Sequence, residues 1–325
     1  MRTRKLLLTA VTALVAASAS VYGLTMADAA TYPNPGVVTG STFAHDPTMI
    51  KRPTGGYLLG YTSPGIGLKT SADRTAFADA GKAFPNGTPW ADAYTASDKN
   101  LWAPDISYVG GKYLMYYSAS TFGSSKSAIF LAGSTTGAAG TWTNYGKVVE
   151  STATSGYNAI DPNLIVTSSG EWWLSFGSFW SGIKMVKLSS ASGKRADSKI
   201  YSIAERFTNS KSIEAPVIVE RNGYFYLFVA FDFCCKGASS TYRIMVGRSK
   251  SITGPYADRA GVAMTAGGGS EILASHDAVH GPGHPAVFRD GSQTVLAYHY
   301  YQANGDAKLG INLLGWDSSG WPYVY

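Results

Sequence analysis

Three acidic residues stand at or beside the same point of a recurring pattern in this sequence of 325 residues. Asp46 and Asp161 each directly precede a proline, and Glu214 stands two residues before one. Carboxylates that lie close together and partly out of water repel one another, which drives their pKa values apart. One can then stay ionised as a base while another stays protonated as an acid. The pattern therefore indicates general acid–base chemistry, provided that the fold brings the three side chains together.

The recurring pattern itself predicts β-hairpins. In residues 158–182 a proline leads into a short apolar segment at 164–166, a break at 168–170 and a second, aromatic-rich segment. The same order of features occurs five times, at spacings of 57, 58, 54 and 69 residues between the prolines that mark it. These marker prolines are Pro47, Pro104, Pro162, Pro216 and Pro285.

Each repeat continues with an apolar third strand, predicted at residues 67–71, 129–134, 183–188 and 244–249. Four short strands per repeat, 37 glycines and no amphipathic helix favour an all-β, five-bladed β-propeller over residues 31–325. A β-sandwich is the alternative, but it does not impose so regular a period. The 40 residues after Pro285 leave ring closure open, because residues 31–44 could instead complete the last blade.

A propeller gives the repeat a functional meaning, because the first strand of every blade lines the central channel. The residues before the marker prolines would then meet at one mouth of that channel. They are Asp46, Ala103, Asp161 and His284, with Glu214 one position earlier in its blade. A lone Asp-Pro pair is usually only a strand or turn start. Glycosidic-bond hydrolysis needs two of these groups, an acid at the leaving oxygen and a carboxylate on the opposite face of the sugar. Three acids at or beside one repeat position can supply that pair.

Aromatic and polar residues near these positions support a carbohydrate ligand. Flat rings can cover the C–H faces of a sugar, and we expect this of Trp102 and Phe179. Asn158 and Ser178 could bind its hydroxyl groups. The two tryptophans within the second strand, Trp172 and Trp173, are expected to pack between blades.

His284 could bind a metal or orient a carboxylate, and a simple hydrogen-bonded histidine is an equal alternative. The other histidines, at positions 45, 276, 280 and 299, show no zinc spacing. Cys234 and Cys235 are adjacent, so they form either a strained disulfide or two buried thiols. Neither feature by itself selects a function.

The N-terminal residues predict export. Three basic residues precede an apolar run at 6–15, and residues 27–29 fit the small-residue rule for signal-peptide cleavage, so we expect a signal peptide at 1–29. The run is too short for a membrane anchor, and no later segment is apolar enough to span a bilayer. Removal of the leader leaves 24 basic against 20 acidic residues, a scattered charge of +4 that argues against a nucleic-acid partner.

Together these motifs resemble the secreted arabinanases of glycoside hydrolase family 43 across nearly the whole mature chain. The resemblance is carried by five segments in order, with Phe231 and Asp232 before the cysteine pair. The segments are His45-Asp46-Pro47, Leu101-Trp102-Ala103-Pro104-Asp105, Asn158-Ala159-Ile160-Asp161-Pro162, Ser212-Ile213-Glu214-Ala215-Pro216 and Gly281-Pro282-Gly283-His284.

The resemblance implies an inverting hydrolase in which Asp46 is the general base and Glu214 the general acid. It makes Asp161 the residue that positions the acid and tunes its pKa, and it makes His284 a ligand of a calcium ion held largely through water. It also favours a disulfide between the two cysteines, facing the cleft. The residues that would contact the sugar are Trp102, Asn158, Ala159, Ile160, Ser178, Phe179, Trp180, Cys234 and Cys235.

We therefore expect an extracellular, monomeric enzyme that cleaves α-1,5-linked arabinofuranosyl chains internally, because no appended module or insertion to block an open groove is seen in the sequence. An exo-acting arabinanase or α-L-arabinofuranosidase is the nearest alternative, and a β-xylosidase fits the motifs less well. A sugar-binding propeller without activity is the alternative from another class. Such a protein would repeat similar residues in every blade, whereas these acids differ between blades.

Overall fold

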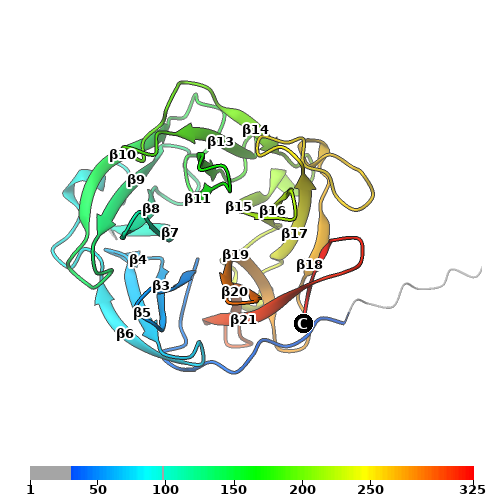
Figure 1. Ribbon diagram of the computed structural model, residues 1–325, viewed down its shortest axis with the longest axis horizontal. Coiled ribbons are helices and arrows are strands. Elements are labelled where there is room, and N and C mark those ends of the chain that lie inside the picture. The colour runs from blue at the N-terminus through cyan, green and yellow to red at the C-terminus, as the bar shows by residue number, and fades with distance from the viewer. Residues whose placement is uncertain (1–30, 97–98) are drawn as a thin grey trace, which may run out of the picture. The chain divides into compact units, whose positions relative to one another are not determined.

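The computed structural model describes residues 31–96 and 99–325, and the expected signal peptide lies outside the described residues. Residues 32–325 form one unit, which is described here by itself. Its strands make five sheets arranged around an axis, as Figure 1 shows. The fold is the all-β, five-bladed propeller that the repeat predicts.

Each blade contains four antiparallel strands in sequence order from the axis outward. In the first two blades these are β2 (Thr48–Lys51), β3 (Tyr57–Tyr61), β5 (Gly67–Ser71) and β6 (Ala76–Lys82), then β7 (Asn100–Val109), β8 (Lys112–Ala119), β9 (Ser127–Ser134) and β10 (Thr143–Ser151). In the other three they are β11 (Asn163–Val166), β12 (Trp172–Phe176), β13 (Ile183–Leu188) and β14 (Tyr201–Ala204); β15 (Ile213–Arg221), β16 (Tyr224–Phe231), β17 (Arg243–Ser249) and β18 (Ser270–Leu273); and β19 (His280–Asp290), β20 (Gln293–Tyr301), β21 (Ala307–Trp316) and β22 (Pro322–Val324).

Short elements complete the description. Strand β1 (Thr39–Gly40) pairs in parallel with the outer strand of the first blade, and β4 (Ser63–Pro64) pairs with β7. The helices in residues 31–96 and 99–325 are 3-10 turns: η1 (Pro89–Ala91), η2 (Asn209–Lys211), η3 (Gly237–Ser239) and η4 (Met264–Ala266). None of these has the length and apolar character that crossing a membrane requires.

The five predicted hairpins and the predicted third strands are present, and the third strands match within two residues. The last blade takes all four of its strands from the C-terminal residues, so residues 31–44 do not complete it. They run instead between the last and first blades, where the Gly36 N–H donates to Ile311 O (2.8 Å) and Thr42 O accepts from the Leu309 N–H (2.9 Å). Their apolar side chains, Val38 and Ala44, are buried against the last blade, which seals the ring.

The core lies between neighbouring blades. The largest clusters of buried side chains each combine residues from two adjacent sheets, such as Leu58 of the first blade with Phe130 of the second. Trp173 is buried between the third and fourth blades, as expected of a packing residue, and Trp172 is half-buried against the cluster of the second and third. Because each sheet buries both faces against its neighbours, the ring fixes the inner strands firmly around the axis.

The residue before each marker proline adopts a left-handed backbone conformation in all five blades. The φ angle is 48° at Asp46, 47° at Ala103, 57° at Asp161, 53° at Ala215 and 53° at His284. This conformation costs a non-glycine residue about 1 kcal/mol or more, so the surrounding structure must hold it in place. The repeat thus gives all five first strands the same backbone conformation at this position. In the fourth blade the residue with this conformation is Ala215, and Glu214 stands one position earlier.

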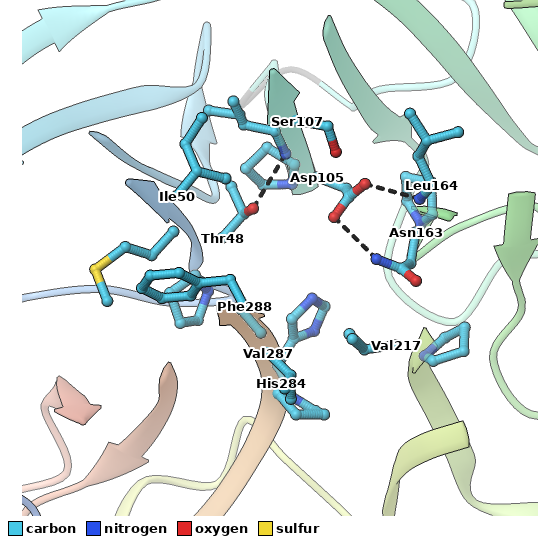
Figure 2. A pocket seen from close by; sticks show the side chains of 18 of the residues that line it. Thr48, Ile50, Asp105, Ser107, Asn163, Leu164, Val217, His284, Val287 and Phe288 are labelled. Atoms are coloured by element: carbon cyan, nitrogen blue, oxygen red, sulfur yellow. Dashed lines mark hydrogen bonds between the residues drawn. The ribbon is translucent and has the colours of Figure 1, made fainter. Parts of the chain in front are cut away.

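Side chains of the inner strands also fasten one blade to the next. The residue after the marker proline in the first three blades accepts a backbone N–H from the following blade, as two of these bonds in Figure 2 illustrate. The three acceptors with their donors are Thr48 Oγ1 with Ile106 N (3.1 Å), Asp105 Oδ2 with Leu164 N (2.8 Å), and Asn163 Oδ1 with Ile218 N (2.9 Å). These bonds set the height of neighbouring inner strands relative to one another.

Candidate active site

The three acids predicted from the sequence come together at one mouth of the central channel. Asp161 feels the negative charge of both Glu214 and Asp46, and Glu214 feels that of Asp46. Below them the channel holds a cavity of about 130 Å³ whose wall includes Asp161. Figure 2 shows Asp105 and His284 in the same wall. The repeat therefore brings the three acidic side chains together, as the acid–base interpretation requires, because it places carboxylates from three blades within electrostatic range.

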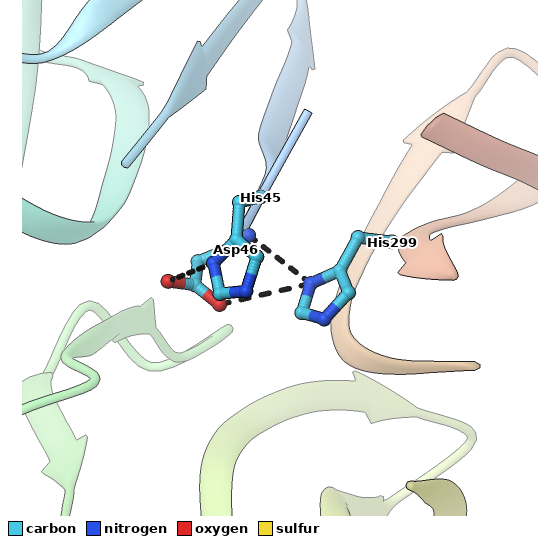
Figure 3. Close-up of side chains that lie close together, drawn as sticks. All are labelled: His45, Asp46 and His299. Carbon is cyan, nitrogen blue, oxygen red and sulfur yellow. Dashed lines mark hydrogen bonds and ion pairs between the residues drawn. The ribbon is translucent and has the colours of Figure 1, made fainter. Parts of the chain in front are cut away.

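Imidazole groups of His45 and His299 lie beside Asp46 (Figure 3), and a hydroxyl group and a third imidazole complete its surroundings. Thr62 donates its hydroxyl to Asp46 Oδ2 (2.6 Å), and His45 Nδ1 lies 2.9 Å from the same oxygen. The other oxygen, Oδ1, faces Nδ1 of His284 at 3.3 Å and Nδ1 of His299 at 3.6 Å. The Asp46 backbone N–H donates to His299 Nδ1 (3.1 Å), which leaves that nitrogen unprotonated.

These neighbours keep Asp46 ionised. Burial alone would raise its pKa, but the neighbouring imidazoles, His45 first among them, hold the pKa well below its usual range. Burial lowers the pKa of His284 and of His299, so near pH 7 these two rings are neutral and the positive charge beside Asp46 is that of His45. Burial also opposes the charge on His45, but the ion pair with Asp46 outweighs it and raises the pKa of His45. Asp46 is thus a fixed carboxylate with one cationic partner.

Glu214 is held by two hydroxyl groups and is only 8% exposed. Ser178 donates to its Oε2 (2.6 Å), and the buried Tyr242 donates to its Oε1. Burial raises the pKa of Glu214 to about 7, with a further contribution from the charge of Asp46. A carboxyl group with this pKa exists in both protonation states near neutral pH, as a general acid requires.

Asp161 links the acid to the neighbouring blade. Its Oδ2 accepts the backbone N–H of Ala215 (3.1 Å), the residue directly after Glu214, and its own N–H donates to Ser118 Oγ (2.9 Å). Burial, followed by repulsion from Glu214 and Asp46, raises the pKa of Asp161 well above its ordinary value. Asp161 and Glu214 therefore compete for protons as a pair.

The residues predicted to contact a sugar occupy two kinds of position. Asn158, Ala159 and Ile160 are buried beneath the mouth, with Asn158 Oδ1 accepting from Ser127 Oγ (2.6 Å) and Ala159 packed in a core cluster. Ser178 is buried against Glu214. The side chains of these residues are therefore largely engaged with protein neighbours.

The predicted aromatic contacts are more open. Trp102, Phe179 and Trp180 are half-buried, and the Phe179 ring lies 6.1 Å from that of Phe233. The Phe179 N–H donates to Ile213 O (2.9 Å), which brings the loop after β12 against the residue before the acid. The rings of Phe179 and Trp180 are therefore available to a ligand beside Glu214.

The two cysteines form a disulfide. Cys235 is exposed, and its backbone N–H donates to the Tyr301 hydroxyl oxygen (2.9 Å). Tyr301 in turn lies 3.0 Å from Nε2 of His45, whose other nitrogen binds Asp46. The cysteine loop is thereby connected to the carboxylate through one tyrosine and one histidine.

A metal ion has two possible positions at this mouth. Ligand atoms of His45, Asp46 and His299 lie within 4.8 Å of one another, and this set of two imidazoles and one carboxylate suits a transition metal better than calcium. Calcium prefers six to eight oxygen ligands. The predicted ligand His284 offers one imidazole in the wall of a 130 Å³ cavity, which has room for several water molecules, so its surroundings fit an ion held largely through water.

Sequence reasoning missed the groups that complete the site. Thr62, Tyr242 and His299 come from second and third strands or their ends, where a polar residue in an apolar strand is the only local signal. His45 stands beside Asp46 in the sequence, yet its role depends on Tyr301 from the last blade. These partners become apparent only when the blades are assembled.

An ionised carboxylate and an acid of raised pKa, facing one mouth of a five-bladed propeller, define a glycoside hydrolase. The comparisons with known proteins agree. The chain belongs to family 43 of these enzymes, since the profile of "Glycosyl hydrolases family 43" matches residues 32–322.

Its relatives include endo-acting and exo-acting enzymes. It is 46% identical over 284 residues to an extracellular endo-alpha-(1->5)-L-arabinanase of Bacillus subtilis, with 86% of each chain covered. It is 38% identical over 298 residues to an extracellular exo-alpha-(1->5)-L-arabinofuranosidase of Cellvibrio japonicus, again with 86% of each covered. The structure of a family 43 endo-arabinanase from Bacillus licheniformis superposes with a TM-score of 0.83 at 43% identity, covering 88% of this chain and 99% of that one.

Proposed function

We propose that this protein is an extracellular endo-1,5-α-L-arabinanase that hydrolyses linear arabinan with inversion of configuration. The observation that carries the proposal is the pairing of an ionised Asp46 with a Glu214 whose pKa is about 7 at one channel mouth. The similarity to an extracellular arabinanase of Bacillus subtilis supports arabinan as the substrate and, with the expected signal peptide, an extracellular location.

Asp46 serves as the general base. Its carboxylate is ionised and oriented by Thr62 and His45 on one oxygen, which leaves Oδ1 on the side of the channel mouth near His284. In an inverting reaction the base takes a proton from the water that attacks the anomeric carbon. Fixing the carboxylate in advance reduces the reorganisation that the reaction requires.

Glu214 serves as the general acid, and Asp161 positions it. Protonated Glu214 gives its proton to the oxygen of the departing sugar. Asp161 holds the Ala215 N–H and so fixes the backbone next to the acid, while its negative charge, when present, favours the protonated form of Glu214. The substrate would lie across the mouth against Trp102, Phe179 and Trp180, with Cys234, Cys235 and the backbone of residues 158–160 beside it.

We also propose that His284 helps to hold a calcium ion, largely through water, in the channel below the acids. The imidazole and the polar cavity wall would bind the hydrated ion, whose charge would offset that of the clustered carboxylates. None of the proton transfers assigned above passes through this ion.

The test of the acid is Glu214→Gln, which keeps the shape of the side chain but replaces the carboxyl group with an amide that cannot act as a general acid. We expect hydrolysis of linear arabinan to fall at least about a hundredfold, with binding of arabino-oligosaccharides retained in calorimetry. Glu220→Gln, at the other end of β15, is the matched control and should keep full turnover. Unchanged turnover in Glu214→Gln would dismiss the assigned acid, and sugar binding by a wild-type protein without hydrolysis would identify a binding propeller instead.

The second candidate is exo-action, which the Cellvibrio relative favours. The two modes differ in the first products that they release from linear arabinan. Internal cleavage gives a ladder of oligosaccharides early in the digest, as we expect here. Release of one short product from the start would assign the exo-acting function.

A further inference from the structure

A second cavity, of about 480 Å³, lies at the opposite end of the propeller axis from the acids. It is bounded by the ends of β11, β15 and β19 and by the turn after β15, and it shares Ile218, Val287 and Phe288 with the channel cavity. Strand β15 runs from the acid to this cavity over seven residues, which is roughly 20 Å of extended chain. A ligand here would not contact the site that cleaves the sugar.

The lining of this distal cavity combines aromatic rings with two guanidinium groups that face solvent rather than a protein acceptor. Arg221 and Arg289 both line it, and no protein oxygen accepts from either guanidinium group within residues 31–96 and 99–325. Every other arginine in those residues donates to a protein oxygen. The two arginines without a protein acceptor therefore line the same cavity.

Neighbouring groups position the Arg221 guanidinium without neutralising it, whereas Arg289 is exposed to solvent. The Arg221 guanidinium lies over the Trp316 ring, 4.7 Å from its centroid, which limits its motion and leaves its N–H edge free. The one carboxylate in the lining, Glu220, is already engaged, because it accepts both the N–H (2.7 Å) and the hydroxyl (2.5 Å) of Ser168. The cavity keeps a net positive charge.

Positive charge continues beyond the rim. Arg248 and Lys250 lie over the ring of Tyr224, at 4.7 and 5.3 Å, on the same end of the fourth blade. In the described part of the chain neither is paired with a carboxylate, and Arg248 donates instead to the backbone oxygen of Ser319 (2.8 Å). An anionic chain leaving the cavity on this side would meet further cations.

We propose that the distal cavity is a binding site for an acidic polysaccharide, in which Arg221 and Arg289 bind the carboxylate of a uronic acid unit. Guanidinium groups match the two oxygens of a carboxylate, whereas a neutral sugar would leave them unpaired. The Phe288 ring offers an apolar wall for the sugar ring, and Asn222 and Thr294 offer partners for its hydroxyl groups. The volume lies in the range of sites for small ligands and suits one or two sugar units. The enzyme would thus be held on a charged polysaccharide while its opposite face cleaves a neutral one.

The test measures binding of trigalacturonate by calorimetry to the full-length mature protein and to Arg221→Gln/Arg289→Gln. We expect saturable binding to the wild type that weakens as salt rises, and an affinity at least about tenfold lower in the double variant. Lys82→Gln/Lys199→Gln removes the same charge elsewhere on the surface and should bind like the wild type. Hydrolysis of arabinohexaose should be equal in all three proteins and should not be inhibited by trigalacturonate.

Several results would overturn the proposal. One is the absence of binding at millimolar trigalacturonate, and another is equal binding by the double variant. Competitive inhibition of arabinohexaose hydrolysis would place the acidic sugar in the active site instead. Equal affinity for the fully methyl-esterified trisaccharide would show that the carboxylate is not recognised, and equally tight, arginine-dependent binding of a single-stranded oligonucleotide would replace the saccharide with a phosphate ligand.

Discussion

Tyr242→Phe should move the alkaline limb of the pH profile without removing the acid. Tyr242 is buried, and its hydroxyl donates to Glu214 Oε1. This bond favours the ionised form of the carboxyl group, so its removal raises the pKa of Glu214 above the present value of about 7. A raised pKa keeps the acid protonated to higher pH. The alkaline limb of kcat/KM therefore shifts upward.

The size of the shift follows from the energy of one hydrogen bond. A bond to a charged group contributes about 1.5–3 kcal/mol, and one pKa unit corresponds to about 1.36 kcal/mol. Since Ser178 still donates to the other oxygen, we expect the lower end of that range, an upward shift of about one unit. The variant should also lose about 1–3 kcal/mol of stability, because Oε1 remains buried without its partner.

The assay is kcat/KM on linear arabinan between pH 5 and pH 10, since this parameter reports the free enzyme. Tyr298→Phe is the matched control, because it removes another buried tyrosine hydroxyl, which donates to Asn312 (2.7 Å) away from the site. It should lower stability similarly and leave the limb in place. A limb that stays fixed or moves downward in Tyr242→Phe would refute the argument.

Two further predictions concern stability and the metal. Phe228→Ala removes a fully buried ring from the core between the fourth and fifth blades and should lower Tm by roughly 10 °C. Phe122→Ala is the control, because its ring is 81% exposed, and it should change Tm by no more than about 1 °C. Equal Tm values in calorimetry would contradict the assigned packing. Chelation should lower both the activity and, by roughly 5 °C, the Tm of the wild type, while His284→Ala should no longer respond. If chelation changes neither quantity in the wild type, the calcium proposal fails.

Much of the fold could be predicted because the repeat is visible in short stretches of consecutive residues. A proline, a short apolar strand, a turn and a second strand are features of neighbouring residues, and each hairpin that they predict is present. The period also placed the acids, because equal positions in equal blades must meet at the axis. Ring closure escaped prediction, since it depends on how residues 31–44 pack against β21, far away in the sequence.

The protonation states of the acids were harder to predict from the sequence. The residues by themselves indicated that the carboxylates would differ in pKa, and only the family resemblance assigned the ionised state to Asp46. Its state depends on His299, which contributes Nδ1 from the last blade, and on Thr62, which also accepts the Ala103 N–H (2.9 Å) at the second blade. Likewise, the state of Glu214 depends on Tyr242, which nothing near the acid in sequence foretells.

By itself the sequence determined the number of blades, the phase of the repeat and the identities of Asp46, Asp161 and Glu214, because these follow from order along one chain. The resemblance assigned Asp46 as base and Glu214 as acid, but only the tertiary structure supplied the physical reason why one acid keeps its proton and the other loses it. Protonation responds to burial and to charges within a few ångströms, and those neighbours are supplied by strands of other blades once the ring has closed.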